Sequence, residues 1–235
     1  ELTKGVAARV LTGEMPRDFD IDAMFESLCR RYPSAFVYLF STQETGTWIG
    51  ASPELLLENK ENMLRTMALA GTRPAGTVGV WDSKNMQEHD VVTDFITRRF
   101  RESGVEPEIS KTVTAPAGPV EHLLTEITGK AGKDTDVSRL LDAMSPTPAL
   151  CGQPRDKALR IIADHESFSR DFYGGYCGPW YADDDFNMFV TIRCAHISPS
   201  RYALYAGGGI MPDSIPDDEW KETDNKIKTL LPDMV

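Results

Sequence analysis

Apolar residues recur along this chain with two different spacings, which predict where helices and strands lie. In the segment FDIDAMFESLCRRY, Met24, Leu28 and Tyr32 follow a helical spacing and form one apolar stripe. The segments AFVYLFS and TWIGAS are typical of strands, and the polar TQETG that joins them is typical of a hairpin turn. We expect helices at residues 19–32, 83–101, 135–144, 154–168 and 216–230, and strands at residues 35–41, 47–52, 54–59, 63–71, 186–197 and 201–207.

The order of these elements predicts the fold class. Strands come in hairpins and helices lie between groups of strands, which favours an α+β fold with antiparallel β-sheet layers flanked by helices over alternating βαβ units. Ser83 is the candidate N-cap of the second helix. The loop from Ala115 to Gly118 is rich in proline and glycine and is a candidate separator of two lobes, but the sequence has no clear domain boundary.

Charge and composition narrow the possible partners. The chain has 235 residues and a formal net charge of -11, so it has no electrostatic reason to bind nucleic acid or an anionic membrane. It contains neither a long apolar run nor a signal peptide, and its four cysteines are not closely spaced. We therefore expect a cytoplasmic protein with reduced thiols, while its oligomeric state stays open. If the substrate is an anion, a bound divalent cation can overcome the negative field.

One carboxylate lies on an apolar helix face. Glu88 stands in line with Val92 and Phe95, so its side chain should face the protein. An ionised carboxylate in that position is costly unless it is paired or bound to a metal. The alternatives are an ion pair with Lys84 or Arg98, or exposure at the helix edge, and the sequence alone favours these.

The last predicted helix carries a second inward-facing group. Glu219, Glu222 and Lys226 fall within about 60° of one another at roughly 100° of rotation per residue. The ordinary explanation is a solvated face with a Glu222–Lys226 pair. The preceding AGGG favours a site, because glycine lets backbone N–H groups approach an anion closely. Magnesium prefers one or two carboxylates plus substrate oxygens, and Glu88 with Glu222 is a suitable pair, although periodicity does not single them out from 36 acidic residues.

Ten short segments, which follow one another in the same order as in a known family, make the chain similar to that family. It resembles the chorismate-utilising enzymes, which include the isochorismate, salicylate, anthranilate and aminodeoxychorismate synthases. Lys4, in place of a glutamine-type residue, and PTPALCG, in place of a PAGTLSG-like run, resemble the isochorismate synthase branch. The matching segments are KGVAAR (4–9), GASPELLL (50–57), LAGTRPAG (69–76), KNMQEH (84–89), EHLLTEITG (121–129), SPTPALCGQP (145–154), RDFYGGYCG (170–178), FVTIRCA (189–195), AGGGI (206–210) and EWKETDNK (219–226).

The resemblance implies a reaction and two catalytic residues. Isochorismate synthase adds water at C2 of the chorismate ring and removes the C4 hydroxyl, which requires a base on one side of the ring and an acid on the other. The family's base matches Lys4 and its acid matches Glu54. Lys4 must then be partly neutral and Glu54 partly protonated, away from reference pKa values of roughly 10.4 and 4.3, and burial shifts each pKa in the required direction. Without that role, both would be exposed residues.

The resemblance also implies how the substrate is held. Mg2+ at Glu88 and Glu222 would bind the ring carboxylate of chorismate, with Glu219 holding metal-bound water. Arg193 would bind the enolpyruvyl carboxylate, because the guanidinium matches both carboxylate oxygens. The remaining substrate-binding positions implied by the family are Thr72, His122, Tyr173, Gly207, Gly209 and Lys226, with a positioning role for His122.

Several departures from the family keep alternatives open. Gly5 and Ala7 replace bulkier residues beside Lys4, Asn85 replaces a common acid near Glu88, and Ser145 replaces a usual histidine. Family members normally have a sizeable segment before the first motif. We therefore expect residues 1–235 to be the chorismate-binding catalytic core domain, with the anthranilate/isochorismate synthase fold lacking its N-terminal part. The alternatives are a salicylate synthase, which also eliminates pyruvate, or an inactive chorismate-binding fragment. An isochorismate synthase would serve either menaquinone or siderophore biosynthesis.

Overall fold

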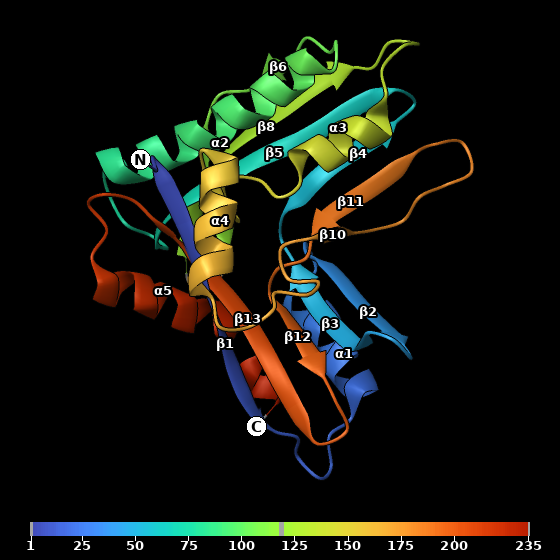
Figure 1. The fold of residues 1–235 in the computed structure, drawn as a ribbon, viewed down its shortest axis with the longest axis vertical. Helices are drawn as coiled ribbons and strands as arrows, with labels where there is room; N and C mark the ends of the chain where they lie inside the picture. Colours follow the sequence, from blue (N-terminus) through green and yellow to red (C-terminus); the bar gives the residue numbers. More distant parts are fainter. Residues whose placement is uncertain (1, 118–119, 235) are drawn as a thin grey trace.

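Two antiparallel β-sheets form the frame of the molecule (Figure 1). The computed structural model describes residues 2–117 and 120–234. Within them, a six-stranded sheet has the order β2-β3-β12-β13-β1-β9, and a seven-stranded sheet has the order β10-β11-β4-β5-β8-β6, with β7 also paired to β8. The strands are β1 (Lys4–Glu14), β2 (Phe36–Thr42), β3 (Gly46–Ser52), β4 (Leu55–Lys60), β5 (Met63–Pro74), β6 (Glu108–Ile109), β7 (Val113–Ala117), β8 (Val120–Lys130), β9 (Gly152–Gln153), β10 (Tyr176–Cys177), β11 (Phe186–Val190), β12 (Cys194–Ile197) and β13 (Arg201–Ile210).

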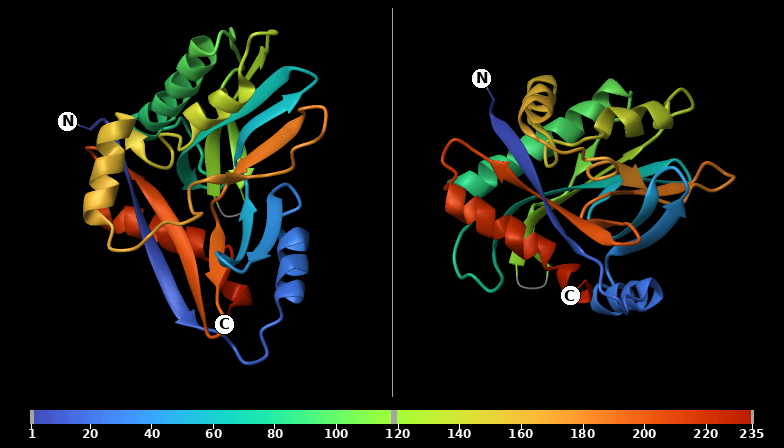
Figure 2. Two further views of the ribbon diagram at one scale, coloured as in Figure 1. Left: turned by 45° about the vertical axis from the view of Figure 1, so that its right-hand side comes forward. Right: turned by 60° about the horizontal axis from the view of Figure 1, so that its bottom comes forward.

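Helices pack on both sheets (Figure 2). Helices α2 and α3 pack on the seven-stranded sheet, α1 packs on β2 and β3, α4 lies beside β1 and β9, and α5 packs on β13. No helix in the described part of the chain has both the length and the apolar character needed to span a bilayer. The helices are α1 (Ile21–Arg31), α2 (Ser83–Glu102), α3 (Val137–Met144), α4 (Arg155–His165) and α5 (Pro216–Ile227), followed by a short 3-10 turn at Leu231–Asp233.

Each sheet has its own hydrophobic core. The core under α2 and α3 contains Phe100, Ile127 and Leu140, all with no exposed surface. The six-stranded sheet buries aliphatic residues against α1 and the C-terminal segment on one face. Its other face carries an aromatic cluster that includes Trp48 and Tyr205, whose ring centroids are 5.4 Å apart. The alternation of side chains along each strand is what separates these two faces.

The α+β prediction is confirmed, with local corrections. All five predicted helices and the two predicted hairpins form. The N-cap prediction is wrong by one residue: Asp82, not Ser83, accepts the N–H of Asn85 with its carboxylate. The predicted strand at residues 186–197 is interrupted between β11 and β12. The predicted separator is a strand instead, because Val113–Ala117 pairs with β8; Gly118 lies outside the described residues.

The interruption matters because it lies where the chain changes sheets. β3 belongs to the six-stranded sheet and β4 to the seven-stranded sheet, and β11 and β12 are divided in the same way. Two backbone hydrogen bonds join these crossings: Val190 N donates to Glu54 O at 3.0 Å, and Ala51 N donates to Arg193 O at 3.0 Å. The two crossings therefore lie side by side, and each carries one predicted site residue.

Two leucines on neighbouring helices test the packing. Leu140 on α3 is fully buried, whereas Leu159 on α4 is 37% exposed. We expect Leu140→Ala to lower the free energy of unfolding by about 2–5 kcal/mol, because it removes buried methyl groups and leaves a cavity. Leu159→Ala should cost less than about 1 kcal/mol, because most surface substitutions change stability little. Urea unfolding of both variants measures the difference, and equal losses would contradict this core.

Candidate active site

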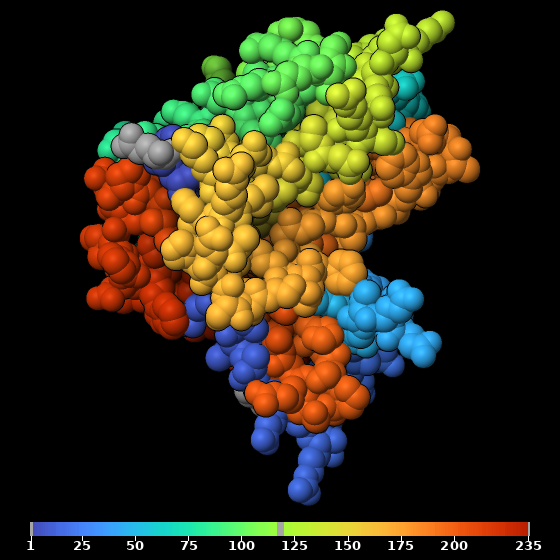
Figure 3. Space-filling view, in the orientation of Figure 1, coloured from blue at the N-terminus to red at the C-terminus, as the bar shows by residue number. Residues whose placement is uncertain are grey.

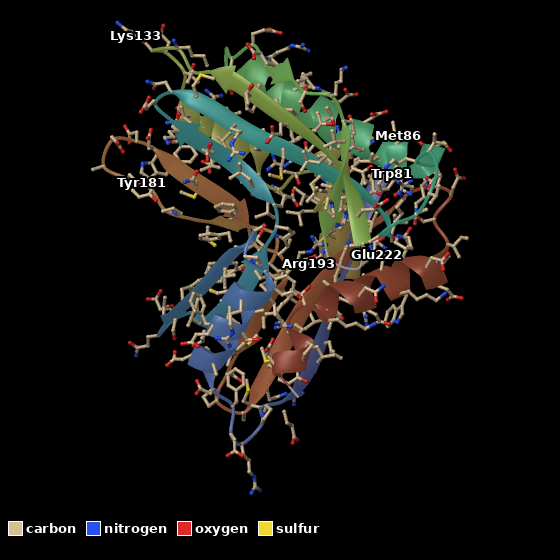
Figure 4. The ribbon with its side chains drawn as sticks, turned by 180° about the vertical axis from the view of Figure 1, so that it is seen from behind. Trp81, Met86, Lys133, Tyr181, Arg193 and Glu222 are labelled. Carbon is tan, nitrogen blue, oxygen red and sulfur yellow. The ribbon has the colours of Figure 1, made fainter. Side chains whose placement is uncertain are left out.

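A pocket opens beside the two crossings, and it collects most of the predicted site residues. Arg193 and Glu222 both lie at the centre of the molecule, where the two sheets meet (Figure 4). Of the predicted residues, only Lys4 and Glu219 are not part of the lining. The predicted residues in the lining are Glu54, Thr72, Glu88, His122, Tyr173, Arg193, Gly207, Gly209, Glu222 and Lys226.

Lys4 reaches the pocket wall from β1. Its side chain is 1% exposed, and its Nζ lies 2.8 Å from Oε1 of Glu88, which comes from the first turns of α2. This contact passes directly over Gly209. A Cβ at position 209 would lie 2.4 Å from Glu88 Oε1 and 2.9 Å from Lys4 Cε, so any larger residue would displace both side chains. The buried lysine is thus compensated by a carboxylate, as a buried charge requires.

Glu54 is the second predicted catalytic residue, and it is almost completely buried. It lies in the crossing between β3 and β4 and is 6% exposed. Burial raises the pKa of Glu54 to about 7, although the positive charges of Lys4, Lys226 and Arg193 act in the opposite direction. A carboxylic acid with this pKa is substantially protonated at neutral pH and can donate a proton.

The glycines of β13 present backbone groups to the pocket. Ala8 and Gly207 are opposite each other in the β1–β13 ladder, and Ala8 donates its N–H to Glu166 instead of to β13. Gly207 therefore points its N–H and C=O away from β1, and Gly209 does the same two residues later. On that side β12 pairs with β13 only as far as Tyr205, so these groups are left open. Lys226 already uses one of them, donating to Gly207 O at 2.8 Å.

His122 and Thr72 form a small polar group on one wall. Nδ1 of His122 lies 3.1 Å from both the Gly71 carbonyl and the Thr72 hydroxyl. Because the carbonyl only accepts, Nδ1 carries the hydrogen and Nε2 is left as an acceptor. Burial lowers the pKa of His122 to about 4, so the ring is neutral at neutral pH. A neutral, hydrogen-bonded imidazole fits the predicted positioning role.

Each of the three predicted metal-site glutamates has a lysine partner. Glu88 pairs with Lys4, and Glu222 pairs with Lys226 at 2.6 Å. Burial raises the pKa of Glu222, but the charge of Lys226 outweighs this together with smaller effects and holds that pKa below its ordinary value. Both carboxylates line the pocket and come from different helices, α2 and α5.

Glu219 lies apart from this pair. Its Oε1 accepts from Lys84 Nζ at 2.5 Å and from the Ser214 hydroxyl at 2.6 Å. It is on the side of β13 that Gly208 faces, opposite to the faces of Gly207 and Gly209. In the described residues, no group of three or more His, Cys, Asp or Glu side chains could hold a metal. The geometry therefore offers a two-carboxylate site, and a direct role for Glu219 stays a prediction.

Arg193 occupies an unusual backbone position. Its φ of 49° lies in the left-handed region, which is uncommon for residues other than glycine. This conformation turns the chain from β11 into β12, and Nη1 donates to the Thr229 hydroxyl at 3.2 Å. Tyr173, 5% exposed, lies nearby against β13: a Cβ at Gly207 would be 2.6 Å from the tyrosine hydroxyl. Both side chains can meet a planar anion in the pocket.

The sequence reasoning missed several residues of the site. Leu150 lines the pocket, and its motif SPTPALCGQP was the available signal. Tyr205 also lines it, stacked on Tyr173 at 5.7 Å, and no pattern in the sequence marked it. Asn85, which replaces a common acid of the family near Glu88, accepts the backbone N–H of Thr72 at 2.8 Å. Its amide thus ties the end of β5 to the start of α2.

Comparison with known proteins places this geometry in a family. Residues 1–235 match the family described as chorismate binding enzyme. The chain is 32% identical to isochorismate synthase EntC of Escherichia coli K12 over 98% of its length, and it spans 62% of that protein. The structure of MenF, the menaquinone-specific isochorismate synthase from Escherichia coli, superposes with a TM-score of 0.83 at 31% identity, over 98% of this chain and 56% of that one.

A more distant structure shares the fold alone. Anthranilate synthase component I from Streptococcus pneumoniae superposes with a TM-score of 0.85 at 24% identity, over 97% of this chain and 53% of that one. The expected anthranilate/isochorismate synthase fold is thereby confirmed. Since the family match extends from the first residue to the last, this chain belongs to the chorismate binding enzyme family.

Proposed function

We propose that this chain binds chorismate and isomerises it to isochorismate, with Mg2+ as cofactor. One observation carries the proposal: a buried, partly protonated glutamate lines a pocket together with groups suited to anions, and a buried lysine lies directly behind the pocket wall, against Glu88. The relatives named above, which are isochorismate synthases, support the same reaction. The chain spans less than two thirds of the length of those relatives, so their activity comes to this chain as a proposal.

The reaction needs acid and base to act on one ring. In its neutral form Lys4 would accept a proton from the water that adds at C2, and Glu54 would donate a proton to the hydroxyl that leaves C4. The ion pair between Lys4 and Glu88 favours the charged amine, so the proposed role requires that this pair opens before the reaction. Glu54 is suited to this role because burial keeps part of it in the acid form. Arg193 and the open N–H groups of Gly207 and Gly209 would hold carboxylate oxygens of the dianionic substrate.

The two pocket carboxylates fit Mg2+. Glu88 and Glu222 supply hard oxygen ligands from two helices, and Gly209 adds no side chain of its own beside Glu88. With only two protein carboxylates, the remaining ligands would come from water and from a substrate carboxylate. When bound, the cation would offset the negative charge of protein and substrate. The relatives include enzymes named for menaquinone and for vibriobactin, so either pathway is compatible with this chain.

A product assay tests the proposed function. Purified protein is incubated with chorismate and Mg2+, and the products are separated by chromatography. Isochorismate as the only product is the expected result. Salicylate together with pyruvate would identify a salicylate synthase, and binding without any conversion would identify an inactive chorismate-binding fragment.

Substitution of the two catalytic residues should remove most of this turnover. We expect Lys4→Ala and Glu54→Gln each to lower kcat by about 10²–10⁴-fold, the range typical for loss of a general acid or base. Steady-state kinetics measures the loss. Glu44→Gln, an exposed glutamate on the β2–β3 turn, is the matched control and should keep the parent rate. A Lys4→Ala variant as active as the parent would exclude Lys4 as the base.

The pH dependence should follow the Glu54 carboxyl. Because its pKa is raised from 4.5 to about 7, kcat/KM should fall as the pH rises through about 7 and the acid form disappears. Stability has the same sign: the contribution of a raised carboxyl pKa is complete below about pH 4.5 and is lost as the pH rises to about 7. Urea unfolding at about pH 5 and about pH 8 should therefore show a smaller decrease for Glu54→Gln than for the parent. Equal decreases would contradict the raised pKa.

Removal of the metal should stop the reaction and leave the fold intact. We expect EDTA to abolish isochorismate formation and excess Mg2+ to restore it, while circular dichroism stays unchanged. Glu88→Gln and Glu222→Gln should each raise the Mg2+ concentration for half-maximal activity by at least about tenfold. Parent-like metal dependence in both variants would place the metal elsewhere.

A further inference from the structure

In the described residues, no strand pairs with the outer edge of β1 beyond Lys4 and Gly5, and an ion pair lies along that edge instead. β9 pairs with β1 only at Lys4 and Gly5, opposite Gln153 and Gly152. From there the outward backbone groups of β1 need other partners, because unpaired buried polar groups are costly. Figure 3 shows α4 and the segment that follows it lying over this part of β1.

Glu166 and Arg170, which follow α4, supply these partners. Glu166 Oε1 accepts the N–H of Ala8 at 2.9 Å, and Arg170 Nη2 donates to the carbonyl of Val6 at 3.1 Å. Arg170 also donates through Nη1 to the carbonyl of Leu150 at 2.8 Å, on the pocket wall. The guanidinium thus joins the strand that carries Lys4 to the loop that lines the pocket.

The pair itself is rigid and well protected. Arg170 Nε donates to Glu166 Oε2 at 2.7 Å, and Nη2 donates to Oε1 at 2.5 Å, which is a two-bond fork. The two side chains are 17% and 10% exposed. A bidentate arginine–carboxylate pair with this burial holds a fixed geometry, unlike a flexible surface pair.

Side-chain packing holds the Lys4 end of β1 weakly on one face, whereas Arg9, further along that face, is anchored to α5. Gly5 has no side chain, and Ala7 is exposed, so neither secures that face of the strand. On the other face, Lys4 and Val6 point inward and are 1% and 4% exposed. The direction of the Lys4 side chain therefore depends on how the backbone of β1 is held. On the edge where no described strand pairs with β1, the hydrogen bonds closest to Lys4 are those to the Val6 carbonyl and from the Ala8 N–H.

We propose that Arg170, held by Glu166, is a positioning residue that fixes the Lys4-bearing strand against the pocket wall. This inference rests on the proposed function, because it assigns the effect of Arg170 to the proposed base. Arg170 contacts two backbone carbonyls and the Glu166 carboxylate, and its guanidinium lies 5.8 Å from the centre of the Tyr173 ring. Arg170 itself is not part of the pocket lining, so we assign its effect to the strand that carries Lys4. A lysine at this position keeps the charge but cannot donate to Glu166, Val6 and Leu150 with the same fixed fork.

The test compares Arg170→Lys with a matched control in the intact chain. Arg65→Lys alters a similar two-bond pair with Glu58 on the β4–β5 hairpin, remote from β1, and should keep parent kinetics. Arg170→Lys should lower kcat for chorismate by about 10²-fold, the cost of misplacing a reacting group by about 1 Å. Its KM should change by less than about threefold, because Arg170→Lys keeps a positive charge near the Tyr173 ring and leaves Arg193 and the glycine N–H groups in place. In a Lys4→Ala background the same change should cost less than about threefold further, since both act on one step.

A second measurement tests the contacts of Glu166 and Arg170 with β1, which we call the clamp, without any turnover. Hydrogen exchange of the Ala8 amide, followed by NMR without substrate, should be faster in Arg170→Lys and in Glu166→Gln than in the parent. Unchanged exchange in both variants would overturn the clamp, as would parent-like kcat in Arg170→Lys. Equal losses of kcat with and without Lys4 would make Arg170 a general structural residue and overturn the assignment. If the parent does not convert chorismate, the proposed function fails, and the Ala8 exchange alone decides whether the clamp exists.

Discussion

The pocket depends on the chain changing sheets twice at the same place. The hydrogen bonds from Val190 to Glu54 and from Ala51 to Arg193 hold the two crossings together. A strand that leaves its sheet must give its backbone groups new partners, and here each crossing supplies them to the other. The result is a fixed separation between a buried acid, Glu54, and a half-buried guanidinium, Arg193, on neighbouring segments that are far apart in sequence. The strained backbone of Arg193 belongs to this junction.

Charge compensation is the second constraint on the site. The chain is strongly acidic, yet the pocket gathers lysine and arginine side chains around its carboxylates. Two of these carboxylates are paired with a lysine: Glu88 with Lys4, and Glu222 with Lys226. Glu54 has no full ion pair within the described residues, and its pKa is therefore raised. The free-energy cost of burying a charged carboxylate is avoided because part of Glu54 is protonated. The pKa values of Glu54 and Glu222 are thus shifted in opposite directions within one pocket.

Close approach of backbone explains the glycines. Gly209 leaves room for the Lys4–Glu88 contact, and Gly207 leaves room for the Tyr173 hydroxyl. The same two residues point their backbone groups away from β1, toward the side that β12 does not cover. Gly208, between them, faces α5 and Glu219. Strand alternation therefore separates two similar glutamates of one helix, so that Glu222 lines the pocket and Glu219 does not.

The sequence by itself determined the helices, the hairpins, the α+β class and, through its motifs, ten of the residues that line the pocket. These are local properties, because periodicity, capping residues and short motifs are contained in a few neighbouring positions. Only the tertiary structure decided that the strand at residues 186–197 breaks at Arg193, that Glu219 pairs with Lys84, and that Arg170 and Glu166 cover the edge of β1. Each of these outcomes depends on partners far away in sequence. Which partner a buried charge or an open strand edge meets is set by how the sheets and helices pack, and no local pattern records it.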